Sequence, residues 1–288
     1  LMMKSKREGL FREPLPRTHS TFSYNIEQAF SDYLTAAYLQ ISSENPRASL
    51  PCPVYTDTYQ QLVAQGARPA NATVADLISP FELKQANSRK AVLLIHGLTD
   101  SPFTYHDLAQ VYYQQGYTVR TILLPGHGTA PAALRDIDAD DWQKASVYAI
   151  ERTLKDFDQV ILGGYSTGAA LVIDYLTQGP VDNKITAAML FSPASEPHNK
   201  NGWLAKWVDA IPFVNWIDKD ADLDFAKYES FPFSAASASH EAMSRISLDE
   251  LRHRQLPNVA IFSTFSDVDT TIDNQATFKI LTKLHDPK

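Results

Sequence analysis

The sequence predicts an α/β protein, with a mostly parallel β-sheet flanked by helices, an inserted helical cap and an N-terminal extension. Two observations lead to this prediction. After residue 90, short apolar runs alternate with longer amphipathic segments, which is the pattern of a parallel sheet covered on both faces. About sixty residues then interrupt the alternation, too many for an unstructured loop in a compact domain.

The first 85 residues are polar and dotted with proline, and we expect them to form an extension packed on the core. Asn25 and Gln28 fit a capping box at the start of one predicted helix, residues 25–41. Five apolar residues share one face of that helix at helical spacing: Ile26, Phe30, Leu34, Ala37 and Ile41.

The core is expected over residues 86–288, with the cap inserted at about 193–257. Apolar runs predict strands, which turn signals and amphipathic segments separate. The predicted strands are 91–95, 119–124, 160–163, 187–191 and 259–263. The predicted helices are 103–115, 141–157, 167–178 and 274–284, and Gly179-Pro180 ends the third of them.

Composition narrows the classes of partner. Among 288 residues, 26 Lys and Arg stand against 33 Asp and Glu, so the formal charge of −7 disfavours nucleic acid. The single cysteine, Cys52, excludes an internal disulfide and a multi-cysteine metal site, and we expect neither a metal nor a cofactor. No apolar run is long enough to cross a bilayer. Because Leu1 is not an initiator Met, we expect that an upstream segment has been removed, for which a signal peptide or a membrane anchor is a candidate. Compartment and oligomeric state stay open.

The pentapeptide 164–168, Gly-Tyr-Ser-Thr-Gly, lies between the predicted strand 160–163 and the predicted helix 167–178. A G-x-S-x-G sequence in this strand–turn–helix setting predicts a nucleophile on a tight turn, at the carboxyl edge of the sheet. Ser166 is therefore the candidate nucleophile. Attack on a carbonyl creates an oxyanion, and we expect the backbone N–H groups of Thr167 and Leu98 to stabilise it. His96 precedes Ser166 in the chain and is interpreted as a brace for its loop.

Three motifs then carry a resemblance to a known family. They are His96-Gly97-Leu98, the Leu-Pro-Gly-His-Gly sequence at 124–128 and the pentapeptide at 164–168. Together they resemble the α/β-hydrolase superfamily, especially the branch of monoacylglycerol lipases, lysophospholipases and small bacterial carboxylesterases. The resemblance covers residues from about 79 onward, and it implies that His127 is structural.

The resemblance also implies an acid just after the strand 259–263. Asp267 and Asp269 both lie there, and Asp269 is favoured because Ile272 follows it at the spacing that the family shows. The family's base lies about thirty residues beyond the acid. His285 is the only later histidine, and the helix 274–284 would carry it about 16 Å from the catalytic edge. We therefore expect that the last strand and the catalytic histidine follow Lys288.

The resemblance implies a serine hydrolase that cleaves carboxylic esters through an acyl-enzyme, with a small acyl ester or lipid-like substrate. The same machinery cleaves amides, so a serine peptidase or amidase is the alternative, and a non-catalytic binding protein with this fold is the second alternative. In the predicted cap, Trp203 and Trp207 share a helical face. They are candidates for the walls of an acyl pocket, and packing of the cap explains them equally well.

Overall fold

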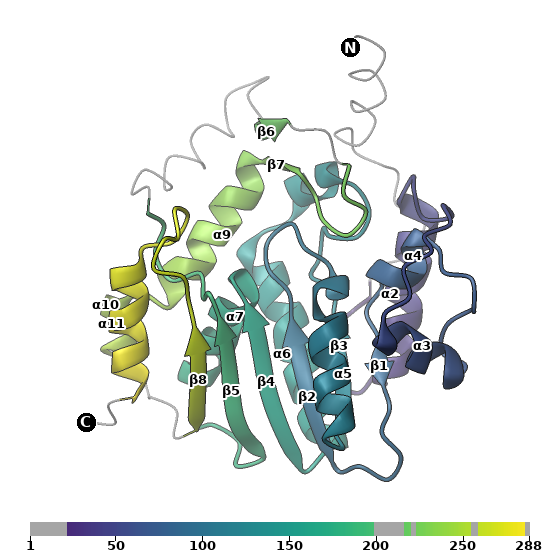
Figure 1. Ribbon diagram of the computed structural model, residues 1–288. Helices are drawn as coiled ribbons and strands as arrows, with labels where there is room; N and C mark the ends of the chain where they lie inside the picture. The colour runs from purple at the N-terminus through teal and green to yellow at the C-terminus, as the bar shows by residue number, and fades with distance from the viewer. Residues whose placement is uncertain (1–21, 199–215, 220–222, 255–258, 286–288) are drawn as a thin grey trace.

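The computed structural model describes residues 22–198, 216–219, 223–254 and 259–285. One six-stranded sheet forms its centre, in the order β1-β3-β2-β4-β5-β8, and only β1 runs antiparallel to its neighbour (Figure 1). The strands are β1 (Glu82–Leu83), β2 (Lys90–Ile95), β3 (Thr118–Ile122), β4 (Gln159–Tyr165), β5 (Ile185–Phe191) and β8 (Ala260–Thr264). The predicted α/β class with a mostly parallel sheet is confirmed.

Strand β2 shows why its sequence is a continuous apolar run. Ala91, Leu93 and Ile95 pack on one face of the sheet, in the cluster that contains helices α6 (Ala139–Asp156) and α7 (Thr167–Thr177). Val92 and Leu94 pack on the other face, in the cluster that contains α5 (His106–Gln114). Since side chains alternate along a strand, both sets must be apolar when both faces are covered.

Helix starts in the core are set by local capping. Asp138 caps α6, because its carboxylate accepts the Asp141 N–H while the Asp141 side chain accepts the Asp138 N–H. Two 3₁₀ turns, η1 (Pro102–Tyr105) and η2 (Pro131–Asp136), begin with proline, which suits the first position of a helical turn. The fourth core helix, α11 (Asn274–His285), lies beside β8 (Figure 1).

The predicted helix at 25–41 begins later than expected. Asn25 closes a turn instead of capping a helix, because its side chain accepts the Glu27 N–H and its carbonyl accepts the Gln28 N–H. Helix α2 therefore spans Phe30–Glu44, and its N-cap, Ala29, offers no side-chain bond. Two short helices follow in the extension, α3 (Asp57–Ala64) and α4 (Val74–Ile78).

The extension holds both ends of the loop that follows β3. The Tyr33 hydroxyl accepts the Leu123 N–H (2.8 Å) and donates to the Leu123 carbonyl (3.1 Å). The Asn45 side-chain amide donates to the Gly128 carbonyl (2.8 Å). All these partners are buried or nearly so, which makes the bonds part of the folded core rather than surface contacts.

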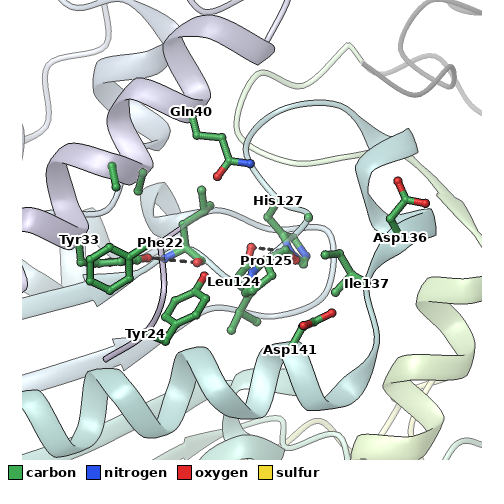
Figure 2. Close-up of a pocket in the computed structure, with 14 residues that line it drawn as sticks. Phe22, Tyr24, Tyr33, Gln40, Leu124, Pro125, His127, Asp136, Ile137 and Asp141 are labelled. Carbon is green, nitrogen blue, oxygen red and sulfur yellow. Dashed lines mark hydrogen bonds between the residues drawn. The ribbon is translucent and has the colours of Figure 1, made fainter. Parts of the chain in front are cut away.

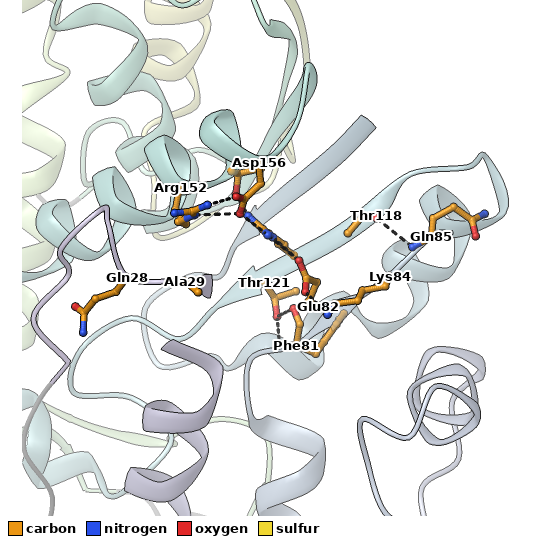
Figure 3. A network of polar contacts seen from close by, with 12 residues as sticks. Gln28, Ala29, Phe81, Glu82, Lys84, Gln85, Thr118, Thr121, Arg152 and Asp156 are labelled. Atoms are coloured by element: carbon orange, nitrogen blue, oxygen red, sulfur yellow. Dashed lines mark hydrogen bonds and ion pairs between the residues drawn. The ribbon is translucent and has the colours of Figure 1, made fainter. Parts of the chain in front are cut away.

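Arg120 on β3 joins the start of the sheet to α6. Its guanidinium contacts the carboxylates of Glu82 on β1 and Asp156 on α6, both at 2.7 Å. Figure 3 shows these carboxylates and Arg152, which also pairs with Asp156. The Arg120 side chain is only 5% exposed, so its charge depends on these partners.

Elements from the insertion lie above the carboxyl ends of the strands in Figure 1: β6 (Trp216–Lys219) and β7 (Ser230–Pro232), which pair, and the start of helix α9 (Phe233–Arg245). Helix α10 (Leu248–Leu251) lies beside α11. Trp203 and Trp207 lie outside the described residues. Within the described ranges, none of the helices combines the length and apolarity that a membrane span requires.

Candidate active site

Ser166 lies at the junction of β4 and α7. It is the N-cap of α7 and has φ 51° and ψ −115°, which places a non-glycine residue in a rarely populated region. Such a conformation costs about 1–3 kcal/mol and persists only where the surroundings impose it. The side chain is half-buried, and its hydroxyl makes no hydrogen bond to any residue that the structure describes. Ser166 thus stands on a strained turn with its hydroxyl available.

The two flanking glycines are required by space. A Cβ on Gly164 would lie 2.4 Å from the backbone of the first turn of α7, at Ala169 N. A Cβ on Gly168 would lie 2.0 Å from the Ile95 carbonyl oxygen, at the end of β2. The start of α7 is therefore packed directly against the start of the loop that follows β2.

That loop, residues 96–101, lies beside Ser166. A Cβ on Gly97 would be 3.2 Å from the Ser166 Cβ. The backbone N–H groups of Leu98 and Thr167 donate to no other group in the described part of the chain. Thr167 is buried and Leu98 is partly buried, and backbone donors away from water are rarely left without a partner. These two donors are therefore suited to hold an oxyanion formed at Ser166.

His96 fixes the direction of the Leu98 N–H. The His96 Nδ1–H donates to the Gly97 carbonyl (2.8 Å), and Nε2 accepts the Leu124 N–H (3.0 Å). Across the trans peptide, the Gly97 carbonyl and the Leu98 N–H point in opposite directions, so holding one orients the other. Burial drives the pKa of His96 well below its ordinary value, which keeps the ring neutral.

His127 makes an analogous pair of bonds. Its Nε2 accepts the Thr99 N–H (3.2 Å), and its Nδ1–H faces the Leu124 and Pro125 carbonyls. Burial lowers its pKa to about 4. Both ring nitrogens of His96 and of His127 are therefore engaged by backbone groups, which leaves neither ring free to take a proton from Ser166.

Asp269 lies in the turn between β8 and α11. Its Oδ1 accepts the N–H groups of Thr271 (2.7 Å) and Ile272 (3.0 Å). The side chain is half-buried, whereas Asp267 is exposed. The turn pairs with the segment that follows β5, through the His198 N–H bond to the Thr271 carbonyl. These contacts hold the Asp269 carboxylate at the carboxyl edge of the sheet.

Asp100 is a carboxylate beside Ser166 that the sequence reasoning did not single out. Its Oδ2 lies 3.1 Å from the position that a Gly97 Cβ would take, the same position that is 3.2 Å from the Ser166 Cβ. Burial raises the pKa of Asp100 to about 6, and Lys227 opposes part of that rise. An aspartate in a loop is usually solvated, so only its burial beside Ser166 distinguishes this one.

The structure does not bring a histidine from the end of the chain to Ser166. His285 is the last described residue of α11, a helix of 12 residues that is about 18 Å long. His198, His240 and His253 belong to the insertion or its start. No group of three metal-ligating side chains occurs within the described ranges.

A cavity of about 320 Å³ lies beside the 124–128 loop, between α2 and the start of α6. Figure 2 shows aromatic side chains, including Tyr33 and Tyr24, toward one end and Asp136 toward the other. His127 contributes to its wall, but Ser166 does not. This cavity is therefore separate from the immediate surroundings of Ser166.

Comparison with known proteins agrees with this geometry. A family model described as serine aminopeptidase S33 matches residues 86–282. A thermostable monoacylglycerol lipase of Bacillus sp. strain H-257 is 33% identical over 130 residues, which make up 43% of this chain and 51% of that protein. The chain thus spans about half the length of this curated relative.

Three solved structures share the fold. One of two metagenome-derived lipolytic enzymes, LipS and LipT, has a TM-score of 0.59 at 24% identity, over 72% of this chain and 83% of that one. A monoglyceride lipase of Saccharomyces cerevisiae has 0.59 at 15% identity, over 71% and 78%. A monoacylglycerol lipase of Paleococcus ferrophilus has 0.54 at 20% identity, over 71% and 83%.

These findings confirm the predicted α/β-hydrolase fold and the resemblance to the monoacylglycerol lipase branch. The match of the family model begins after the N-terminal extension and includes the motifs around His96, His127 and Ser166. With more than half of its length matched, the chain belongs to the serine aminopeptidase S33 family of α/β-hydrolases.

Proposed function

We propose that this chain is a serine hydrolase that cleaves carboxylic esters through an acyl-enzyme on Ser166. The observation that carries the proposal is the strained turn at Ser166, beside two backbone N–H groups that donate to no described residue. The curated relative, named a monoacylglycerol lipase, supports an acyl ester or lipid-like substrate.

In the proposed reaction, the Ser166 oxygen attacks the ester carbonyl carbon while a base takes the hydroxyl proton. The carbonyl oxygen becomes an oxyanion, which the N–H groups of Leu98 and Thr167 stabilise by about 3–4 kcal/mol each. Collapse of this intermediate expels the alcohol, which receives the proton from the base. Water then attacks the acyl-enzyme by the same steps and releases the acid.

We assign the orienting acid to Asp269 and the base to a histidine outside the described residues. Two bonds from backbone N–H groups to Oδ1 support Asp269, because they hold its carboxylate in place. The exposure of Phe262 on β8 (59%) and of Phe278 on α11 (62%) supports a further element beside β8. The contacts of His96 and His127 leave those rings without a free acceptor.

Labelling with a fluorophosphonate tests the nucleophile, since the reagent reacts with activated serines. We expect the protein as its gene encodes it to be labelled and Ser166→Ala to lose the label. Ser192→Ala is the matched control, because Ser192 is also half-buried, follows β5 and has a positive φ of 40°. Absence of label in all three proteins would favour the non-catalytic binding protein.

The description of the family as aminopeptidases favours an amide substrate as the second candidate. A substrate with a free amino group needs an anion near the nucleophile, and Asp100 is a carboxylate beside Ser166. Turnover of p-nitrophenyl acyl esters should be compared with that of aminoacyl p-nitroanilides. Preference for the anilides, together with a raised KM in Asp100→Asn for those substrates alone, would overturn the ester assignment.

A further inference from the structure

The return segment of the insertion, residues 223–230, lies against the loop that carries Leu98. The Tyr228 N–H donates to the Thr99 carbonyl (2.8 Å). Thr99 has a φ of 68°, the left-handed conformation that non-glycine residues rarely adopt. Thr99 is thus a strained residue next to Leu98, a proposed oxyanion donor. A backbone hydrogen bond from Tyr228, about 130 residues further along the chain, holds it in this conformation.

The Tyr228 side chain contacts a second loop of the site. Its hydroxyl accepts the Thr129 N–H (2.8 Å) and donates to the Gly126 carbonyl (3.2 Å). Its ring stacks on the His127 ring, with centroids 6.1 Å apart and an interplanar angle of 11°. Only 7% of Tyr228 is exposed, so these bonds are shielded from water.

His127 links the two loops that Tyr228 contacts. Its Nε2 accepts the Thr99 N–H, while Tyr228 binds the Thr99 carbonyl. Both backbone groups of Thr99 therefore have a hydrogen-bond partner. Tyr228 binds the carbonyl directly, and its ring packs on His127, which binds the N–H. Leu98 lies between these contacts. The peptide group that follows Leu98 is fixed by the bond from the Thr99 N–H to His127, and the peptide group that precedes it is fixed by the bond from His96 to the Gly97 carbonyl.

We propose that Tyr228 is a positioning residue that holds the 96–101 loop so that the Leu98 N–H faces the oxyanion formed at Ser166. This inference rests on the proposed function. It assigns to the insertion a role in the chemistry in addition to any role in covering the site. The hydroxyl is the part to remove, because its bonds to Thr129 and Gly126 fix the position from which the Tyr228 backbone N–H and ring hold Thr99. Tyr228→Phe removes only these two bonds and keeps the backbone N–H and the ring.

The matched control is Tyr59→Phe. Tyr59 is fully buried, and its hydroxyl also donates to a backbone carbonyl, that of Pro69 (2.8 Å), but within the N-terminal extension. Both variants should have a lowered Tm. Only Tyr228→Phe should lower kcat, by about 10-fold to 100-fold with KM within about twofold, because a displacement on the order of 1 Å has this effect on catalysis.

Amide hydrogen exchange provides a readout that does not need turnover. In Tyr228→Phe, the peptides that cover residues 96–101 should exchange faster, whereas Tyr59→Phe should leave them at the parent rate. An unchanged kcat, an unchanged loop exchange, or a loss seen only in KM refutes the positioning role. An inactive parent protein refutes the proposed function instead, and exchange alone then decides whether Tyr228 holds the loop.

Discussion

Gly168→Ala tests the contact between the turn that carries Ser166, the proposed nucleophile, and the loop that carries Leu98, a proposed oxyanion donor. The added Cβ would lie 2.0 Å from the Ile95 carbonyl oxygen and 2.6 Å from the His96 carbonyl oxygen, and real Cβ atoms essentially never come closer than 3.0 Å to such atoms. Both obstacles are backbone atoms, so no rotamer change relieves the clash. The first turn of α7 must therefore move from the end of β2 by about 1 Å.

This movement should lower both the free energy of unfolding and the rate of catalysis, and the effect on the rate should be the larger. Overpacking typically lowers the free energy of unfolding by about 1–3 kcal/mol. A clash with two backbone oxygens should lie at the upper end, at about 3 kcal/mol. The strand end that is pushed away continues into the loop that carries Leu98. Moving a donor from about 2.9 Å to about 3.9 Å from the oxyanion removes its hydrogen bond. Loss of one such donor lowers the rate about 100-fold to 1,000-fold.

The assay is the rate of fluorophosphonate labelling of Ser166, measured at a temperature where circular dichroism shows the variant folded. Gly179→Ala is the matched control, because a Cβ at Gly179 meets no heavy atom within 4 Å and needs no positive φ. We expect the control to match the parent protein in labelling and in Tm. Labelling of Gly168→Ala at the parent rate would refute the reasoning.

Two further perturbations test charged groups. Burial raises the pKa of Asp100 from 3.8 to about 6, so deprotonation of this carboxyl opposes folding. The resulting loss in the free energy of unfolding is absent below pH 4, grows up to about pH 6 and then stays constant at roughly 2–3 kcal/mol. Asp100→Asn should therefore raise Tm at pH 7.5 but not at pH 4, and a Tm difference that is the same at both values would contradict this. Arg120→Met removes the shared cation of Glu82, whose side chain is 8% exposed, and of Asp156, whose side chain is 23% exposed. Lys84 and Arg152 still pair with these carboxylates, so urea unfolding should show a loss of about 3 kcal/mol, at the lower end for a broken buried ion pair. A loss below about 1 kcal/mol would mean that the network contributes little.

The parts of the fold that the sequence predicts well are those with a local physical cause. Residues 91–95 are all apolar because both faces of the sheet are covered, and five consecutive apolar residues are enough to reveal this pattern. The turn at Ser166 is equally local, since Gly164 and Gly168 are small for reasons that lie within the pentapeptide and its immediate neighbours.

Local patterns fail where an alternative partner is available. Asn25 and Gln28 have the spacing of a capping box, but an asparagine side chain binds a backbone N–H two residues ahead as readily as one at a helix start. Ala29, which has no capping group, precedes the first helical residue instead. Packing of the buried α2 residues Phe30, Tyr33 and Ala37 decides where this helix begins.

The contacts that surround the 96–101 loop could not be predicted from the sequence for a different reason. Tyr33 and Asn45 of the extension hold the two ends of the 123–128 segment, and Tyr228 of the insertion binds its middle and the neighbouring Thr99. None of these three residues belongs to a recognisable motif, and each acts on a loop at least 80 residues away in the chain. The motifs thus identify the groups that would carry out the chemistry, while segments outside the motifs set the geometry of those groups. Because a displacement on the order of 1 Å is enough to remove an oxyanion bond, such segments determine how well the motif works, and changes within them should affect kcat before they affect binding.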